Sequence, residues 1–293
     1  IETLPKGVEI ANADDVVDMH DDPATVIKKK AGSSMVVGLQ MLKEGGGDAF
    51  VSAGSTGALL SAATLIVRRV KGIRRAAMGP QIPTKGGGQA VLIDCGATAD
   101  CTPEFLLQFA FMGSYYAQAV LGVENPRVGL LNIGAEDSKG GELQKAVYPL
   151  LKQVGEAGGL NFIGNVEARD VPLGAADVVV ADGFSGNILL KGIEGTALFM
   201  ASMMKDMFKK NVFTKLAALL CMDGVRAFKK KIDYGEVGGT ALIGLNKPVI
   251  KAHGSSDALA IRNAIRQAIA AVEADVAGKL AANMDRMVLP KEG

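Results

Sequence analysis

Short, continuous apolar runs recur along the chain, and each one ends in glycine or small polar residues. Five of these runs predict strands, at Asp48–Ala53, Gln89–Asp94, Arg127–Ile133, Asp177–Ala181 and Pro248–Ala252. Because the apolar residues are continuous rather than alternating, these strands are expected to be covered on both faces. A loop rich in glycine or small polar residues follows each strand. This order predicts an α/β fold, with a mostly parallel sheet and helices on both sides.

Helical patterns follow several of the loops. We predict helices from the glycine loop at 54–57 to about Arg69, from about Pro103 to Leu121, and onward from near Asp257. Proline at the first turn is typical of a helix start. The tail from Ala281 is expected to be loosely attached.

Residues 186–234 differ from the rest of the chain. They are helical by pattern, rich in methionine and studded with lysine, with interruptions near Asn211 and near Asp223–Gly224. We interpret them as a helical excursion within a single α/β domain that spans residues 1–293.

Composition narrows the class of protein. The chain has 293 residues, and its 32 basic and 31 acidic residues nearly cancel, so net charge predicts no nucleic acid partner. Three cysteines without C-x-x-C spacing argue against a disulfide framework and for a reducing compartment. The sequence opens without a signal peptide pattern, and no run of 18 uncharged apolar residues is found. We expect a soluble, cytoplasmic protein.

The loop Gly54-Ser55-Thr56-Gly57 lies where a strand becomes a helix. Free backbone N–H groups and the helix dipole favour an anion there, and two hydroxyl groups add donors. A tight turn with a serine or threonine cap is the alternative. The loops at Cys95–Ala97 and Gly183–Gly186 repeat the pattern, and three such loops in one sheet favour a phosphate site.

The loop after the third strand places an amide, two carboxylates and a lysine together. It runs from Asn132 through Gly134, Glu136 and Asp137 to Lys139. Lys139 could bind phosphate as a point charge, or stabilise negative charge on an attacked carbonyl. A surface loop with a salt bridge is the alternative.

Other candidates lie in the loops after the fourth and fifth strands. Asn187 could donate its amide to an oxyanion, or could cap the helix that follows the glycine loop beside Asp182. His253 precedes Gly-Ser-Ser-Asp at a strand end, where a ligand contact and a structural role are about equally expected. Cys95 is a conceivable thioester nucleophile, but a buried apolar role is favoured.

Several long motifs resemble the bacterial phosphate acyltransferase family PlsX, in the family's order and spacing, from about Ile1 to Ala282. They are Ala53-Gly-Ser-Thr-Gly-Ala-Leu, Asp94-Cys-Gly-Ala, Pro103-Glu-Phe-Leu-Leu-Gln-Phe-Ala with Met112-Gly-Ser, Asn125-Pro-Arg-Val-Gly-Leu-Leu-Asn-Ile-Gly, Asn161-Phe-Ile-Gly-Asn-Val-Glu-Ala-Arg-Asp, Ala181-Asp-Gly-Phe-Ser-Gly-Asn and Val249-Ile-Lys-Ala-His-Gly-Ser-Ser-Asp. The family also opens with a strand ending in Met-Gly-Gly-Asp, which this sequence does not contain, and often has Asn at the positions of Ser55 and Thr98.

The resemblance implies a Rossmann-like three-layer sandwich related to isopropylmalate dehydrogenase and phosphotransacetylase. It implies transfer of an acyl group from acyl-carrier protein to orthophosphate, without a metal or organic cofactor. It also implies a cytoplasmic homodimer that can touch the membrane surface. The sequence contains no G-x-G-x-x-G, Walker A or G-x-S-x-G pattern. It therefore gives no indication of a nicotinamide, nucleotide or serine-nucleophile site.

Combining motifs and resemblance, we predict three catalytic residues: Lys139, Asn187 and His253. Further contacts to phosphate or substrate are predicted for Gly54, Ser55, Thr56, Gly57, Asp94, Gly96, Asn132, Gly134, Asp182, Gly183 and Ser255. Orthophosphate is expected to bind at the 54–57 loop, near Lys139, and to attack the thioester directly. A phosphotransacetylase-like or dehydrogenase-like enzyme and a non-catalytic scaffold are the rival functions.

The basic, methionine-rich excursion at 186–234 has three open interpretations. Its lysines could steer an acidic acyl-carrier protein, and the same face could meet anionic lipid. The third interpretation is an ordinary solvent-exposed helix face that covers the core of a dimer.

Overall fold

The computed structural model describes residues 4–232 and 238–287 of the chain. Within these ranges the strands are β1 (Phe50–Ser52), β2 (Ala77–Gly79), β3 (Gln81–Pro83), β4 (Gln89–Ile93), β5 (Arg127–Asn132), β6 (Asn161–Glu167), β7 (Val178–Val180), β8 (Gly239–Ile243) and β9 (Val249–Ala252). The helices are α1 (Val26–Lys29), α2 (Ser34–Glu44), α3 (Thr56–Ile66), α4 (Pro103–Val120), α5 (Glu142–Glu156), α6 (Gly183–Lys209), α7 (Val212–Leu220), α8 (Met222–Ile232), α9 (Ala258–Glu273) and α10 (Val276–Ala282). Two short 3-10 turns cover Ala168–Asp170 and Met284–Met287.

The strands form two sheets, of orders β1-β9-β8-β2 and β3-β4-β7-β5-β6. In the five-stranded sheet β4, β7, β5 and β6 are parallel, and only the edge strand β3 is antiparallel. In the four-stranded sheet β1 and β9 are parallel, whereas β8 is antiparallel to both its neighbours. The α/β fold class is confirmed, and all five predicted strands are present. The expectation of a single sheet is corrected to two.

The segment from 77 to 83 joins the two sheets. It forms β2 in one sheet and β3 in the other, with Pro80 between them. The Pro80 carbonyl accepts the N–H of Leu92 at 3.0 Å, and the Met78 N–H donates to the Asp94 carboxylate at 2.8 Å. Both bonds attach this segment to the end of β4. These two strands were not predicted because each has only three residues and Pro80 interrupts the apolar run that they form.

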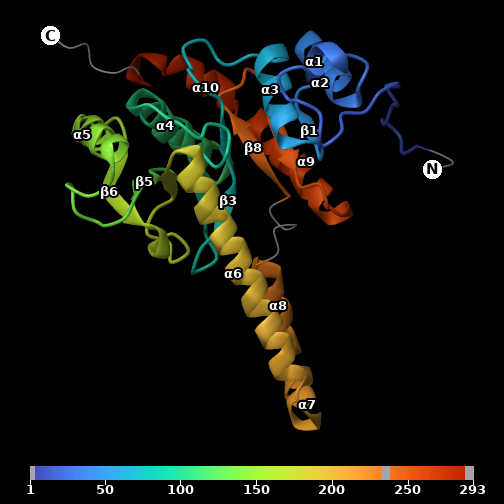
Figure 1. Cartoon of the computed structure of the whole chain (residues 1–293), viewed down its shortest axis with the longest axis vertical. Coiled ribbons are helices and arrows are strands. Elements are labelled where there is room, and N and C mark those ends of the chain that lie inside the picture. Colours follow the sequence, from blue (N-terminus) through green and yellow to red (C-terminus); the bar gives the residue numbers. More distant parts are fainter. Residues whose placement is uncertain (1–3, 233–237, 288–293) are drawn as a thin grey trace.

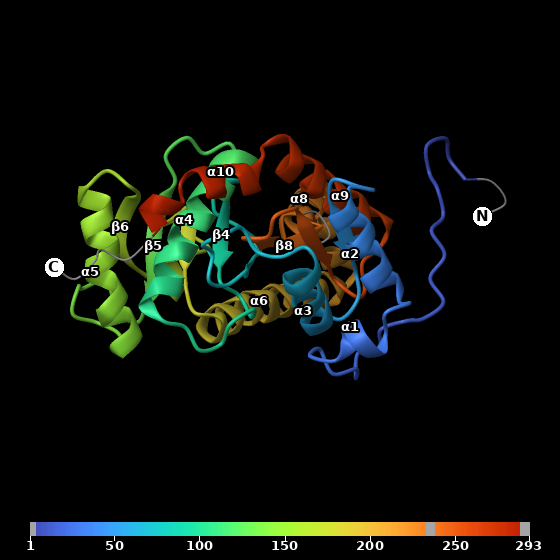
Figure 2. The ribbon, with the colours of Figure 1, turned by 90° about the horizontal axis from the view of Figure 1, so that it is seen from above.

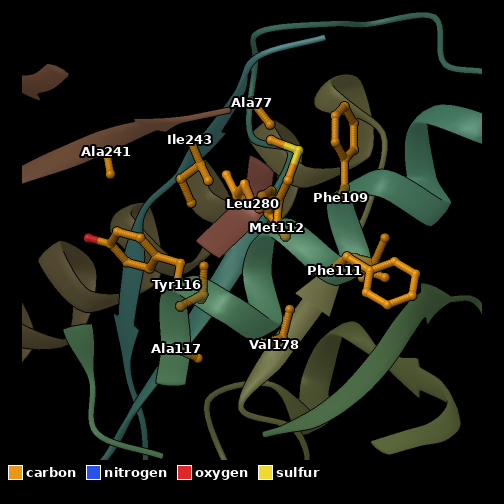
Figure 3. Close-up of a cluster of buried hydrophobic side chains, with 14 of the residues drawn as sticks. Ala77, Phe109, Phe111, Met112, Tyr116, Ala117, Val178, Ala241, Ile243 and Leu280 are labelled. Atoms are coloured by element: carbon orange, nitrogen blue, oxygen red, sulfur yellow. The ribbon is translucent and has the colours of Figure 1, made fainter. Parts of the chain in front are cut away.

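Helix α4 fills the core between the two sheets. Figure 3 shows its Phe109, Met112 and Tyr116 beside Ile243 of β8 and Val178 of β7. Eleven of the eighteen residues of α4 are buried, because its central turns are largely apolar on all sides. Glycine at position 113 permits the close approach, since a Cβ there would lie 2.5 Å from a Val178 methyl group. This common core supports one domain over 1–293, which stays a prediction.

Smaller apolar clusters cover the outer faces of the sheets. Helices α2 and α3 pack on the four-stranded sheet, and the start of α6 covers one face of the five-stranded sheet. Figure 2 shows α1 and α2 at one end of the molecule and α5 with β6 at the other. The predicted arrangement of helices on both sides of the strands is therefore present.

Helices α6, α7 and α8 project away from the sheets as a long hairpin with α7 at its tip (Figure 1). The predicted break near Asn211 is confirmed, because its side chain caps α7 by accepting the Thr214 N–H at 2.9 Å. The second predicted break, near Asp223–Gly224, is present but lies two residues earlier, at Cys221 between α7 and α8. Residues 233 and 234 lie outside the described ranges.

One helix boundary, two strands and the C-terminal tail also differ from expectation. The predicted 54–69 helix ends at Ile66, and strands β6 and β8 were not predicted. Glycine and polar residues interrupt the apolar pattern of β6, and β8 follows shortly after the predicted excursion, which ends at residue 234. The tail is packed rather than loose as far as Met287, whose side chain is fully buried in the main core.

Candidate active site

The predicted site residues fall into two groups in the structure. The loops after β1 and β9 belong to the four-stranded sheet, whereas those after β4, β5 and β7 belong to the five-stranded sheet. The expectation of three glycine loops in one sheet is therefore corrected. Strands β8 and β2 separate the two groups. The loops after β1 and β9 touch each other, as do the loops after β4 and β7. No described contact joins Lys139 to the 54–57 loop, so their joint action stays a prediction.

The N-terminus of α3 has free hydrogen-bond donors within the described ranges. Ser55 occupies the cap position and is buried, yet its side chain makes no capping hydrogen bond. Among the described residues, no acceptor is found for the N–H groups of Thr56, Gly57 and Ala58. Unpaired N–H groups at a helix start, together with the helix dipole, attract anions. This is the arrangement predicted for the 54–57 loop, and the alternative of a serine cap is not found.

Small residues bring this loop close to its surroundings. A Cβ on Gly57 would lie 3.0 Å from the ring of Pro23, and one on Gly54 would lie 2.8 Å from Met35. The Gly54 N–H also donates to the Ser52 hydroxyl at 3.2 Å. These contacts fix the start of α3 against Pro23 and against the first turn of α2. We infer that the two glycines shape the loop, while Ser55 and Thr56 supply hydroxyl groups.

The loop after β9 lies beside the 54–57 loop. Strands β1 and β9 are parallel, with Ser52 level with Lys251, and the Cβ position of Gly254 is 3.9 Å from the Ala53 carbonyl. The Nδ1 atom of His253 accepts the Ser255 N–H at 3.2 Å and lies 2.7 Å from the Ser255 hydroxyl. An accepting Nδ1 leaves the proton of the neutral ring on Nε2. His253 is exposed, so this Nε2–H is accessible to a ligand.

One residue of this group was missed by motif reasoning. Lys251 lies on β9, is only 9% exposed, and donates from Nζ to the carbonyl of Ala252. Burial lowers the pKa of its ammonium group. A lysine inside an otherwise apolar strand is the signal that could have revealed it, since lysine is rarely buried without a partner.

The second group centres on Asp94, which is fully buried. Its carboxylate accepts the N–H groups of Met78, Cys95, Ala97 and Thr98 at 2.7–3.3 Å. Burial raises the pKa of Asp94, and these four N–H groups oppose the shift. Both oxygens are therefore occupied in holding the loop after β4. A direct contact between Asp94 and substrate stays a prediction.

The loop at Cys95–Ala97 does not repeat the helix-start geometry. Helix α4 begins only at Pro103, with Thr102 as its cap residue. The predicted helix-dipole contribution at Gly96 is therefore wrong. Gly96 has a φ of +115°, a conformation that favours glycine, and its Cβ position would face the Asn187 amide at 4.0 Å. We find Gly96 and Asn187 together, as the prediction of a common site requires.

The third glycine loop is the first turn of α6. Asp182 caps this helix by accepting the Ser185 N–H at 2.8 Å, and the Gly183 N–H donates to the Thr98 carbonyl at 2.8 Å. Because these N–H groups are paired and Asp182 adds negative charge, this helix start is a poorer anion site than α3. Asn187 lies in the second turn, exposed, and is not the helix cap.

The loop after β5 presents Lys139 to solvent. Asn132 braces the loop by donating to the Lys139 carbonyl at 3.1 Å and accepting the Ile133 N–H at 2.8 Å. Asn165 of β6, which motif reasoning did not select, adds a bond to the Glu136 carbonyl at 2.8 Å. The Lys139 stem lies over Gly134, whose Cβ would be 3.0 Å from it. Lys139 forms no ion pair within the described ranges, so the salt-bridge alternative is not found.

The thiol of Cys95 is unsuited to nucleophilic attack. Cys95 is 3% exposed, and burial with the nearby Asp94 raises its pKa to about 12. Since the thiolate is the nucleophile, the group is unreactive near neutral pH. The predicted buried apolar role of Cys95 is confirmed.

A basic cavity lies apart from the predicted site residues. It has a volume of about 340 Å³ and is lined by Arg69, Gly72, Ile73, Arg74, Arg75 and Phe105. Arg74 pairs with Glu104, and the Arg75 guanidinium lies over the Phe105 ring. Over 4–232 and 238–287, no cluster of three or more His, Cys, Asp or Glu could hold a metal, and no helix is long and apolar enough to cross a membrane.

Solved structures share this fold. A phosphotransacetylase EutD from Staphylococcus aureus has a TM-score of 0.52 at 20% identity, over 84% of this chain and 70% of that one. A phosphotransacetylase from Streptococcus pyogenes has a TM-score of 0.52 at 21% identity, over 88% of this chain and 76% of that one. At this identity the similarity concerns the fold alone, and it agrees with the predicted α/β class.

Sequence relatives are much closer. The family model for "Fatty acid synthesis protein" matches residues 2–279. A protein of Thermoanaerobacterium thermosaccharolyticum named "Phosphate acyltransferase" is 50% identical over 271 residues, which cover 92% of this chain and 80% of that protein. One of the same name from Geobacillus thermodenitrificans is 50% identical over 279 residues, covering 95% and 84%. The chain therefore belongs to the fatty acid synthesis protein family, which confirms the resemblance noted in its motifs.

Proposed function

We infer that this chain is a phosphate acyltransferase, which transfers an acyl group from acyl-carrier protein to orthophosphate and so supplies acyl phosphate for phospholipid synthesis. The name of its relatives and the family model support this function. The observation that supports it is the N-terminus of α3, where Ser55 makes no capping bond and the first N–H groups have no acceptor among the described residues. An oxyanion could accept from these donors.

Orthophosphate is itself the nucleophile in this proposal. One phosphate oxygen attacks the thioester carbonyl carbon, the carbon–sulfur bond breaks, and the carrier thiolate leaves and takes up a proton. The enzyme then needs to position the two substrates and to stabilise negative charge on the carbonyl oxygen. We assign phosphate binding to the α3 N-terminus, with His253 as a contact or proton donor through Nε2. We assign Lys139 and Asn187 to stabilising the negative charge on the phosphate and on the attacked carbonyl oxygen.

The assay for this function needs no cofactor. The protein is incubated with acyl-carrier thioester and radiolabelled orthophosphate, in buffer containing a metal chelator and no nicotinamide. Acyl phosphate and free carrier thiol should form in equal amounts. A requirement for nicotinamide would favour a dehydrogenase, and binding of carrier without product would favour a scaffold.

We propose that the hairpin tip contacts an anionic membrane. The apolar side chains of α7 lie on one side of the helix and are exposed; they are Val212, Phe213, Leu216, Leu219 and Leu220. Exposed Lys209, Lys210 and Lys215 flank them. An exposed apolar face rimmed by lysine is typical of helices that lie on anionic lipid. The same lysines could attract an acidic carrier protein, so carrier and membrane use one surface in this proposal.

The double variant Phe213→Gln, Leu216→Gln should lose binding to anionic vesicles while keeping its catalytic rate in solution. The polar side chains remove the apolar surface that would enter the lipid. Vesicle co-sedimentation measures the binding, and Leu65→Gln, which removes an exposed apolar side chain from α3, is the matched control. Equal sedimentation of the double variant and wild type would contradict the membrane role of α7.

We also propose a cytoplasmic homodimer that touches the membrane only peripherally. An exposed apolar stripe on α9, formed by Ile265, Ile269 and Val272, supports a second contact surface outside the hairpin. These residues recur at helical spacing, so they share one side of the helix. Light scattering in solution measures the mass directly.

A further inference from the structure

Lys251 is held in an unusual position for a lysine. Residues alternate along β9: Ile250 and Ala252 belong to the main core, whereas Val249 packs in the cluster formed with α2 and α3. By this alternation the side chain of Lys251 lies on the face that α3 covers. Its Nζ reaches forward to the carbonyl of Ala252, the last residue of the strand. The ammonium group therefore lies at the end of β9 where α3 begins.

This charge has no counterion within the described part of the chain. No carboxylate pairs with Lys251, and burial alone accounts for the lowered pKa of its ammonium group. Burying a charge without an opposite charge beside it is strongly unfavourable. Lysine at this position therefore destabilises the empty protein. A bound anion beside Nζ would remove the penalty.

The neighbouring groups would also accept such an anion. The N–H groups at the start of α3 have no acceptor among the described residues. The Ser256 hydroxyl, in the loop beside them, is enclosed by protein and has no hydrogen-bond partner in the same ranges. Three kinds of donor thus lie on segments that meet at the ends of two adjacent parallel strands: an ammonium, backbone N–H groups and a hydroxyl.

We propose that Lys251 is a catalytic residue that binds the orthophosphate nucleophile, with Ser256 as a second ligand. The inference rests on the proposed function and extends it, because it assigns the phosphate to the four-stranded sheet. Lys251 offsets the charge of the dianion and holds it at the α3 N-terminus. An oxygen of this phosphate then attacks the thioester, and the carrier leaves as the thiol.

The test compares Lys251→Met with Lys247→Met. Lys247 lies just before the opposite end of the same strand and donates to the Gly47 carbonyl at 3.0 Å, so it controls for loss of a partly buried lysine. Lys251→Met should raise KM for orthophosphate about 10- to 100-fold, the effect of one charge-assisted hydrogen bond. KM for acyl-carrier protein should not change, and Lys247→Met should match wild type for both substrates.

A binding measurement separates this proposal from the proposed function. Orthophosphate alone should raise the Tm of wild type and of Lys247→Met but not that of Lys251→Met, whose unliganded Tm should equal or exceed wild type. This readout requires no acyl transfer, so it stands even if the enzyme assay fails. The proposal would be overturned if Lys251→Met kept the wild-type KM for orthophosphate and the wild-type Tm shift on adding orthophosphate. It would also be overturned if the unliganded Tm of Lys251→Met fell and its KM rose equally for orthophosphate and for acyl-carrier protein.

Discussion

Replacing Gly186 with alanine should destabilise the protein by about 3 kcal/mol, although alanine normally stabilises a helix. A Cβ at this position would lie 2.0 Å from the Asp94 carbonyl oxygen and 3.4 Å from the Cys95 Cα. Both neighbours are backbone, and the Asp94 carboxylate ties that backbone to four N–H groups. Neither side can move without breaking these bonds. Chemical denaturation monitored by circular dichroism measures the loss.

Gly192→Ala is the matched control on the same helix. Gly192 is exposed, and a Cβ there meets nothing within 4 Å. This variant should be more stable than wild type by about 0.5–1 kcal/mol, because alanine loses less backbone entropy in a helix. If the two variants had the same stability, the close packing of α6 on the loop after β4 would not be what requires glycine at 186.

Replacing Lys139 with methionine should lower kcat about 10²- to 10³-fold, with little change in stability. The side chain is exposed and makes no ion pair within the described ranges, so the fold loses nothing when the charge is removed. Its backbone is held by Asn132 instead. Steady-state kinetics with both substrates, together with a denaturation curve, measure the two effects.

Lys145→Met removes a nearby exposed lysine from α5 and should keep the wild-type rate. Asn187→Ala should lower kcat as Lys139→Met does, because both side chains are assigned to stabilising negative charge on the reacting groups. A Lys139→Met enzyme that turns over at the normal rate would remove this loop from the mechanism and leave the α3 and β9 loops together with Asn187.

Continuous apolar runs predicted the central strands correctly because burial on both faces leaves a strong pattern. The same rule failed for β2 and β3, where Pro80 divides one segment between two sheets. It also failed to reveal the division of the strands into two sheets. Strand order depends on pairing between distant segments such as β7 with β4 and β5, and local periodicity carries no information on that.

The candidate site was predicted in its parts but not in its arrangement. Glycine and polar residues after a strand mark a loop that faces ligands, and Gly54–Gly57 was found in this way. The sequence does not show whether the N–H groups at a helix start are free. That depends on contacts between distant segments, such as the hydrogen bond from the Gly183 N–H to the Thr98 carbonyl. Lys251 was overlooked because its strand was interpreted by its apolar neighbours, while the cost of burying its charge is apparent only once β9 is placed under α3.

In the proposed reaction, orthophosphate attacks the thioester directly and no acyl-enzyme forms. Cys95 is buried with a pKa near 12, and the open helix start suits an oxyanion rather than an activated side chain. The most direct measurement mixes enzyme with excess acyl-carrier protein in the absence of orthophosphate. Acid quenching at successive times and mass spectrometry then quantify free carrier. Direct attack predicts no free carrier until orthophosphate is added. A rapid burst of about one free carrier per active site before that addition would contradict it.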